Sequence, residues 1–174
     1  MEWVGKPYRK EFYEGFRFTT NNRMELLAVI VGLEKLKNSD TKVLVVSDSK
    51  YVVDSVVKKW VFGWEKKGYI GKKNPDLWKR FLVVFRKQQV DFKWIKGHNN
   101  HPQNERCDEL AVMASQQNTL SVDAFYEKGW NTVFPINSYV QSTKDENVYE
   151  GKPFGKDALG FPYDLSKYIG NGTW

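Results

Sequence analysis

The feature that most constrains the fold is a short apolar run, Val43–Val46, which stops abruptly at Ser47 and Asp48. A continuous run of this kind is typical of a strand covered on both faces, as in a parallel sheet. Segments with apolar residues at helical spacing lie on both sides of it. We therefore predict an α/β fold in which Val43–Val46 is an inner strand.

The remaining elements follow from the same periodicities. Alternation of side chains predicts a half-buried strand from Tyr8 to Phe18 and another from Val90 to Ile95. Helical spacing predicts four helices, which run approximately over residues 23–37, 51–64, 75–85 and 104–116. No internal repeat is present. The order of elements is strand, helix, strand, helix, helix, strand, helix, which supports the α/β class.

The chain changes character at about Thr119, where a tail rich in Gly, Pro and aromatic residues begins and periodicity fades. Its aromatic residues are too frequent for a disordered segment, so we expect the tail to pack against something. We predict a folded domain over residues 1–127 and a C-terminal extension over residues 128–174.

Charge is distributed unevenly along the chain. Of the 27 Lys and Arg and 21 Asp and Glu, residues 1–118 hold 22 basic and 14 acidic, and residues 119–174 hold 5 and 7. A basic body favours a polyanionic partner, although a merely soluble basic protein fits the charge equally well. No apolar run approaches the roughly 20 residues of a membrane helix, and no signal pattern opens the chain. The single cysteine cannot form an internal disulfide, so we expect a cytoplasmic protein.

Three acidic residues have positions that suit a shared site. Glu25 lies in the first turn of a predicted helix, Asp48 at the end of the apolar strand, and Asp108 in the first turn of the last predicted helix. Each could simply cap or stabilise a helix start. If the three converge, they would instead form a site for a hard cation such as Mg²⁺. The spacing leaves both interpretations open.

Three segments together resemble the motifs of type I ribonuclease H, the family of bacterial ribonuclease HI. They are Thr19–Leu26 (TTNNRMEL), Val46–Val52 (VSDSKYV) and Lys96–Ala111 (KGHNNHPQNERCDELA), and they occur in the family's order. The resemblance covers roughly residues 1–127. It implies a mixed sheet flanked by helices, with the tail as an addition.

The resemblance also implies an activity, an endonuclease that hydrolyses the RNA strand of RNA–DNA hybrids and leaves 5′-phosphate and 3′-hydroxyl ends. Glu25, Asp48 and Asp108 match metal-binding catalytic carboxylates, with Mg²⁺ as the cofactor and Mn²⁺ as a substitute. His98 matches a catalytic loop histidine that moves protons or assists product release, which suits a group that titrates near neutrality. His101 is more simply explained by a hydrogen bond that braces the loop.

Nucleic-acid contacts are implied at two places. Near the carboxylates, the matching residues are Thr20, Asn21, Asn22, Lys50 and Asn104. Residues 58–73 hold six Lys against one Glu and match a basic protrusion that grips the DNA strand. Lysines there would follow phosphates and tryptophans would stack, although helical spacing also allows the tryptophans to face the core. The binding residues implied in this segment are Trp60, Trp64, Lys66 and Lys67.

The chain departs from the family at its start, because the family opens with a strand that carries a TDGS-like motif and a fourth carboxylate. Either the natural protein extends upstream of Met1, which we expect, or the tail rebuilds that strand. In the second case Thr132–Phe134 or Tyr139–Val140 would supply a strand. The carboxylate would then come from Asp123, Asp145 or Asp164.

Other interpretations remain open. Without the first carboxylate, the chain could be a hybrid-binding module with little or no catalysis. His98, His101 and Cys107 could offer zinc ligands, but no fourth ligand is obvious and the neighbouring apolar Ala111 suggests that Cys107 is buried. No obligate protein partner is evident from the sequence, which is compatible with a homodimer or with a strand exchanged between two copies.

Overall fold

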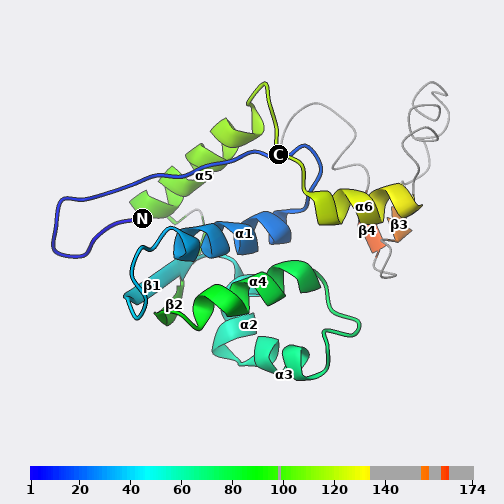
Figure 1. The fold of residues 1–174 in the computed structure, drawn as a ribbon. Helices are drawn as coiled ribbons and strands as arrows, with labels where there is room; N and C mark the ends of the chain where they lie inside the picture. The colour runs from blue at the N-terminus through cyan, green and yellow to red at the C-terminus, as the bar shows by residue number, and fades with distance from the viewer. Residues whose placement is uncertain (98, 134–153, 157–161, 165–174) are drawn as a thin grey trace.

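A computed structural model describes residues 1–97, 99–133, 154–156 and 162–164, with side chains up to residue 129. The described part contains six helices and two small sheets (Figure 1). The helices are α1 (Asn21–Glu34), α2 (Lys50–Val57), α3 (Trp60–Lys66), α4 (Pro75–Phe85), α5 (Pro102–Ser115) and α6 (Ala124–Val133). None of the described helices is long and apolar enough to cross a membrane.

The principal sheet is the parallel pair β1 (Lys42–Ser47) and β2 (Gln89–Trp94), which pairs Val43 with Val90 and Ser47 with Trp94. The predicted strands of the two segments are thus confirmed. A second, antiparallel pair is formed by β3 (Phe154–Lys156) and β4 (Pro162–Asp164).

One face of the principal sheet is open, which contradicts the prediction that Val43–Val46 is covered on both faces. Leu44 is 59% exposed and Val46 is 43% exposed. Their cross-strand neighbours are Asp91 and Lys93, so this face mixes apolar and charged side chains. Val43 lies on the other face and packs against the helical core. Within the described residues, β1 is hydrogen-bonded only to β2, and its second edge is unpaired.

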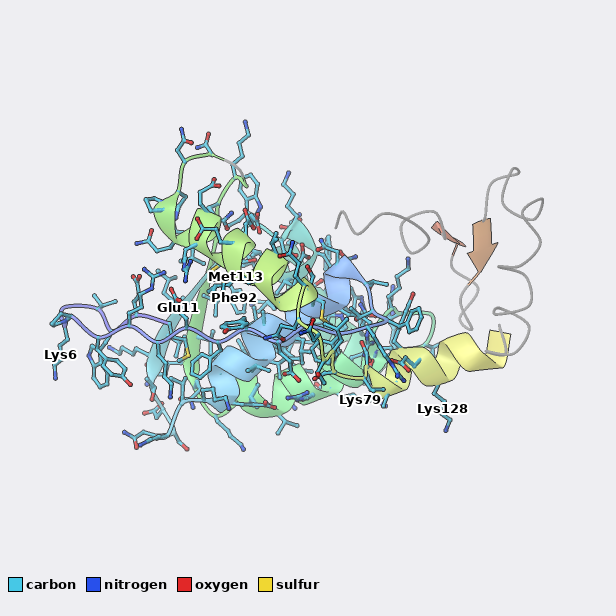
Figure 2. The ribbon with its side chains drawn as sticks, turned by 90° about the horizontal axis from the view of Figure 1, so that it is seen from above. Lys6, Glu11, Lys79, Phe92, Met113 and Lys128 are labelled. Carbon is cyan, nitrogen blue, oxygen red and sulfur yellow. The ribbon has the colours of Figure 1, made fainter. Side chains whose placement is uncertain are left out.

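The strand predicted from Tyr8 to Phe18 is wrong, because this segment forms no continuous hydrogen-bonded ladder with another strand of the described residues. This segment makes only isolated bridges, between Glu2 and Arg9 and between Phe16 and Ser121. It runs along α5 (Figure 1) rather than along β1, so it has no strand to pair with. Arg106 of α5 donates two hydrogen bonds to Glu11, which projects beside that helix (Figure 2).

The single helix predicted over residues 51–64 is instead two helices. The chain breaks at Lys58 and Lys59, and Lys59 adopts the left-handed conformation with φ 60°. After the break Val61 is fully buried, and the Trp64 ring packs edge-on against Trp78. Packing of Val61 and of one face of Trp64 against the core therefore accompanies the break between α2 and α3.

The core lies where α1, α2 and α4 pack on the inner face of the principal sheet (Figure 1). Trp78 and Phe81 of α4 are fully buried at its centre. The Trp78 indole donates a hydrogen bond to the Tyr51 hydroxyl at 2.8 Å, so the polar atom of the largest core side chain is satisfied. This packing fixes the helices whose early residues carry the acidic groups.

A buried arginine joins α1 to α4 and to the segment that begins α6. Arg23 is 2% exposed, donates to Asp123 at 2.6 and 2.8 Å, and donates to Asp76 at 2.9 and 2.7 Å. Burial alone would lower the pKa of Arg23, but the hydrogen bonds to the two carboxylates outweigh it and raise the pKa. We call these three residues the Arg23 clasp.

The proposed rebuilding of the sheet by the tail is not seen in the described residues. Asp123 belongs to the Arg23 clasp, and Thr132 and Val133 lie in helix α6 rather than in a strand. Asp164 lies in β4, which pairs only with β3. Phe134, Tyr139–Val140 and Asp145 lie outside the described residues. The domain boundary at residues 127 and 128 stays a prediction and falls within α6.

Candidate functional site

Glu25 and Asp48 are brought together although they come from different elements. Glu25 lies in the second turn of α1, and Asp48 directly follows β1. Burial raises the pKa of Glu25 above its ordinary value, hydrogen bonds from Ser49 and Asn21 oppose this, and the charge of Asp48 raises it further. Burial is the largest cause of the shift, and the charge of Asp48 adds to it.

The residues around these carboxylates hold them in place. The Ser49 hydroxyl caps α2, where it accepts a hydrogen bond from the Val52 amide, and it donates one to Glu25. Asn104 of α5 donates to Asp48 Oδ2 at 3.3 Å. The first turns of α2 and α5 and the body of α1 therefore meet at this point.

Gly97 lies against Asp48 with no room for a side chain. A Cβ at residue 97 would come within 2.6 Å of Asp48 Oδ2. Such a distance is below any normal van der Waals contact, so glycine is required for the carboxylate to keep its position. The loop after β2 is thus shaped around Asp48.

Asp108 lies on α5 one helical turn beyond Asn104. It lines an open surface hollow together with Glu105, Glu109, Val112 and Met113. Within the described part of the chain, no three His, Cys, Asp or Glu residues are grouped closely enough to hold a metal ion. Among these residues the fold therefore joins Glu25 to Asp48 but does not complete a three-carboxylate group with Asp108.

The loop between β2 and α5 holds the two histidines, and Cys107 follows on the helix. His98 lies outside the described residues. His101 is the residue before α5; its Nδ1 atom is buried, and it has no hydrogen-bond partner among the described residues. The bracing hydrogen bond expected for His101 is therefore not made through this atom. Cys107 is exposed, which contradicts the burial expected from its neighbour Ala111, because that face of α5 is open.

The nucleic-acid residues predicted near the carboxylates cluster around the first turns of α1, α2 and α5. Thr20 caps α1, and Asn21 Nδ2 donates to Glu25 Oε1 at 2.8 Å, while Asn22 is exposed. Lys50 is the first residue of α2, and its ammonium lies 4.9 Å from the centre of the Trp94 ring. Of the predicted residues, Asn21 thus contacts Glu25, and Asn104 contacts Asp48.

The predicted basic protrusion corresponds to α3 and the turns after it. Trp60 is 48% exposed, with the Lys58 ammonium 5.0 Å from its ring centre. Trp64 divides its surface between the core residue Trp78 and the ammonium of Lys72. Lys66 and Lys67 end α3 and are exposed. The two interpretations of the tryptophans therefore separate, since Trp60 faces solvent and Trp64 faces the core in part.

Comparison with known proteins identifies the family. The sequence profile of the RNase H family matches residues 3–116. The chain belongs to the ribonuclease H family. A ribonuclease H of Desulforamulus reducens is 50% identical over 123 residues, which span 68% of this chain and 77% of the relative. A ribonuclease HI of Shewanella oneidensis is 45% identical over 127 residues, 70% of this chain and 79% of the relative.

A solved structure supports the fold of this family. The crystal structure of LC9-RNase H1, described as a type 1 RNase H with the type 2 active-site motif, is 33% identical and superposes with a TM-score of 0.53. The match covers 70% of this chain and 60% of that chain. The α/β, ribonuclease H-like fold predicted from the sequence is thus confirmed.

Three residues of the site were missed by sequence reasoning. Ser49 could have been found, because a serine directly before a helix is an N-cap signal. Gly97 belongs to the Lys96–Ala111 motif, but nothing in the sequence shows that it lies against Asp48. Trp94 donates its indole hydrogen to the Asp48 main-chain oxygen at 3.0 Å, a contact that depends on the register of β1 and β2.

Proposed function

We propose that this chain is an endonuclease that hydrolyses the RNA strand of RNA–DNA hybrids and leaves 5′-phosphate and 3′-hydroxyl ends. The observation that carries the proposal is the approach of Glu25 to Asp48 at the end of β1, amid exposed polar and basic side chains. Membership of the ribonuclease H family supplies the reaction class.

The donor set fits a divalent cation. Carboxylate oxygens are the ligands that Mg²⁺ and Mn²⁺ prefer, and a cation would offset the burial of Glu25 and its repulsion by Asp48, which both raise the pKa of Glu25. Glu25 and Asp48, which already lie together, would hold Mg²⁺, with Mn²⁺ as a substitute, and Asp108 is assigned as a third ligand because of the motif at Lys96–Ala111. When bound, two such ions supply activation of the attacking water and stabilisation of the leaving oxygen.

The chain's own residues bind and orient the substrate. Ser49 and Asn104 hold the two carboxylates, while Thr20, Asn21 and Asn22 form the start of α1, where Asn21 donates to Glu25. We assign these three α1 residues to the hybrid's grooves, where 2′-hydroxyl groups distinguish RNA from DNA. His98 would move a proton, which suits an imidazole.

The DNA strand is assigned to the α3 protrusion. Exposed Lys66 and Lys67 would neutralise phosphates, and the exposed Trp60 ring offers a flat apolar surface to a sugar or base. Trp64 contributes through its lysine-covered face, because its other side packs on Trp78. Loss of lysines there should weaken hybrid binding uniformly across sequences.

A second candidate function is a hybrid-binding module with little or no catalysis. It is favoured by the absence of a three-residue metal-binding group within the described residues. In this case the basic surfaces would bind a hybrid, but no scission would follow in either metal.

One assay separates the two functions. A hybrid with end-labelled RNA is incubated with the chain in Mg²⁺ and then in Mn²⁺, beside Asp48→Asn and a matched control, Asp54→Asn. Asp54 is also an acidic residue, but it pairs with Lys58 on the surface of α2. The endonuclease predicts cleavage that Asp48→Asn abolishes and Asp54→Asn preserves.

The other outcomes are equally informative. Binding of the hybrid without cleavage in either metal would favour the binding module. Cleavage that persists unchanged in Asp48→Asn would refute the assignment of this site, and no binding at moderate salt would discredit both functions.

A further inference from the structure

Trp94 occupies a position that core packing does not explain. It ends β2 beside the site, it is 42% exposed, and it is among the largest side chains left open to solvent in the described part of the chain. Burial of a tryptophan ordinarily stabilises a fold, and exposure gives up much of that contribution. A large exposed ring next to Asp48 therefore points to a role at the surface.

Two contacts connect this ring to the site. The indole nitrogen donates to the Asp48 main-chain oxygen at 3.0 Å, and the Lys50 ammonium lies 4.9 Å from the ring centre. Asp48 follows β1, Lys50 begins α2, and Trp94 pairs with Ser47 across the sheet. The ring thus lies between the carboxylate's main chain and a fixed positive charge.

The position of Lys50 is not explained by helix stability. A cation in the first turn of a helix opposes the helix dipole. A cation–π contact with Trp94 instead restrains the long, flexible side chain of Lys50 on one side of Asp48. A lysine restrained in this way presents a compact charge suited to a phosphate.

We propose that Trp94 is a positioning residue for the nucleic acid: its ring holds the Lys50 ammonium beside Asp48, where that ammonium contacts a backbone phosphate of the bound hybrid. The inference rests on the proposed function, because it concerns the same site. Trp94 acts through the face of its ring on Lys50, and the pairing of β2 with β1 places that ring beside Asp48. The pair adds a sequence-independent contact next to the carboxylates.

The test measures hybrid binding without turnover. Dissociation constants of the full chain for a fluorescent hybrid are determined in EDTA over a series of salt concentrations. Removal of a single phosphate contact reduces the steepness of log K against log salt by about 0.7–0.9. We expect Lys50→Gln to show that reduction and a severalfold weaker affinity.

The Trp94 variants separate the ring from its hydrogen bond. Trp94→Leu removes the ring and the hydrogen bond, and it should reproduce the reduced salt slope of Lys50→Gln. The variant that combines Lys50→Gln with Trp94→Leu should show the same slope and affinity as either single variant. Trp94→Phe keeps a ring and should retain the parental slope, as should Lys50→Arg. If Trp94→Leu melts below the assay temperature, Trp94→Met takes its place.

A second lysine–tryptophan pair offers the matched control. The Lys6 ammonium lies 5.1 Å from the Trp3 ring, and Lys6 is at the tip of the N-terminal segment (Figure 2). Lys6→Gln and Trp3→Leu should leave the salt slope unchanged. If these variants lose as much of the salt slope as Lys50→Gln does, any surface lysine contributes to binding, and the proposal is overturned.

Failure of this inference differs from failure of the proposed function. If the parental chain does not bind the hybrid, the proposed function fails and this inference fails with it. If the parent binds and Trp94→Leu keeps the full salt slope, the proposed function stands but the positioning role is refuted. Strict additivity of Lys50→Gln and Trp94→Leu, or loss of the slope in Trp94→Phe, would also refute it.

Discussion

At the scale of single residues, Glu25 shows a conflict between stability and a cation site. Its pKa is raised by burial and by the nearby charge of Asp48. The folded state therefore binds the Glu25 proton more tightly than the unfolded state does. Stability falls as the pH rises from the unfolded carboxyl value, about 4.3, through the raised folded value.

Replacement of this carboxylate should stabilise the protein. We expect Glu25→Gln to raise the free energy of unfolding at pH 7 by roughly 0.5–1 kcal/mol, because relief of a strained functional site commonly stabilises. The difference should vanish at pH below the unfolded carboxyl value. Denaturant unfolding at both pH values checks this, and Glu65→Gln is the control with opposite sign. The Arg86 hydrogen bond lowers the pKa of Glu65, so that variant should lose stability at pH 7.

Gly97 offers a residue-scale test of the site's geometry. Because a Cβ would approach Asp48 Oδ2 to 2.6 Å, Gly97→Ala must displace that carboxylate. We expect hybrid cleavage to fall roughly ten- to hundredfold, as a small misplacement of a reacting group can cost this much. Gly32→Ala in α1, where a Cβ meets nothing within 4 Å, should keep full activity. Equal rates for Gly97→Ala and the parent would contradict the placement of Asp48.

At the scale of elements, the Arg23 clasp fixes the helix that carries Glu25. Asp123→Asn removes the charge of one partner of the buried Arg23. We expect the free energy of unfolding to fall by about 2–4 kcal/mol, because Asp76 still pairs with the arginine and limits the loss. The matched substitution is Glu34→Gln, because Glu34 and its partner Arg80 are 33% and 46% exposed. It should have a much smaller effect, because water screens exposed pairs. Urea unfolding monitored by circular dichroism measures both variants. Similar losses of unfolding free energy in the two variants would contradict a dominant role of the buried pair.

The elements themselves show what the sequence can and cannot predict. The β1 segment and α4 were predicted because apolar spacing and Pro75 are local signals. The strand at residues 8–18 was predicted wrongly, since alternation shows only that a segment can be half buried, and pairing depends on a neighbour elsewhere in the chain. The break at Lys59 escaped detection for the same reason, because packing of Val61 and Trp64 competes with helix continuity.

The candidate site likewise contains residues that the sequence predicted and residues that it did not. Motifs named Glu25 and Asp48, and the structure brings these two together. Its supporting contacts, from Ser49, Trp94 and Gly97, depend on the register of two strands and on a loop's path. The sequence signals Ser49 as a helix cap, but no spacing in it predicts the contacts of these three residues with Glu25 and Asp48. Sequence therefore identified the acidic groups better than the residues that hold them.

At the scale of the whole molecule, the edge of β1 that is unpaired within the described residues favours self-association. Unpaired strand edges recruit further strands, and Leu44 and Val46 add apolar surface beside this one. We expect the chain to associate with rising concentration and Leu44→Lys to reduce this association. Sedimentation velocity over a concentration series measures it. Val83→Lys, which alters a similarly exposed apolar residue on α4, should leave it unchanged, and a monomer at all concentrations would contradict the expectation.

The Arg23 clasp also sets an order of events during synthesis. Arg23 lies 53 residues before Asp76 and 100 residues before Asp123. At about 5–20 residues per second, a ribosome needs roughly 5–20 s to make the stretch between Arg23 and its last partner. During that interval Arg23 can engage Asp76 but not Asp123. The helix that carries Glu25 is thus secured only when nearly all of the folded domain has been translated.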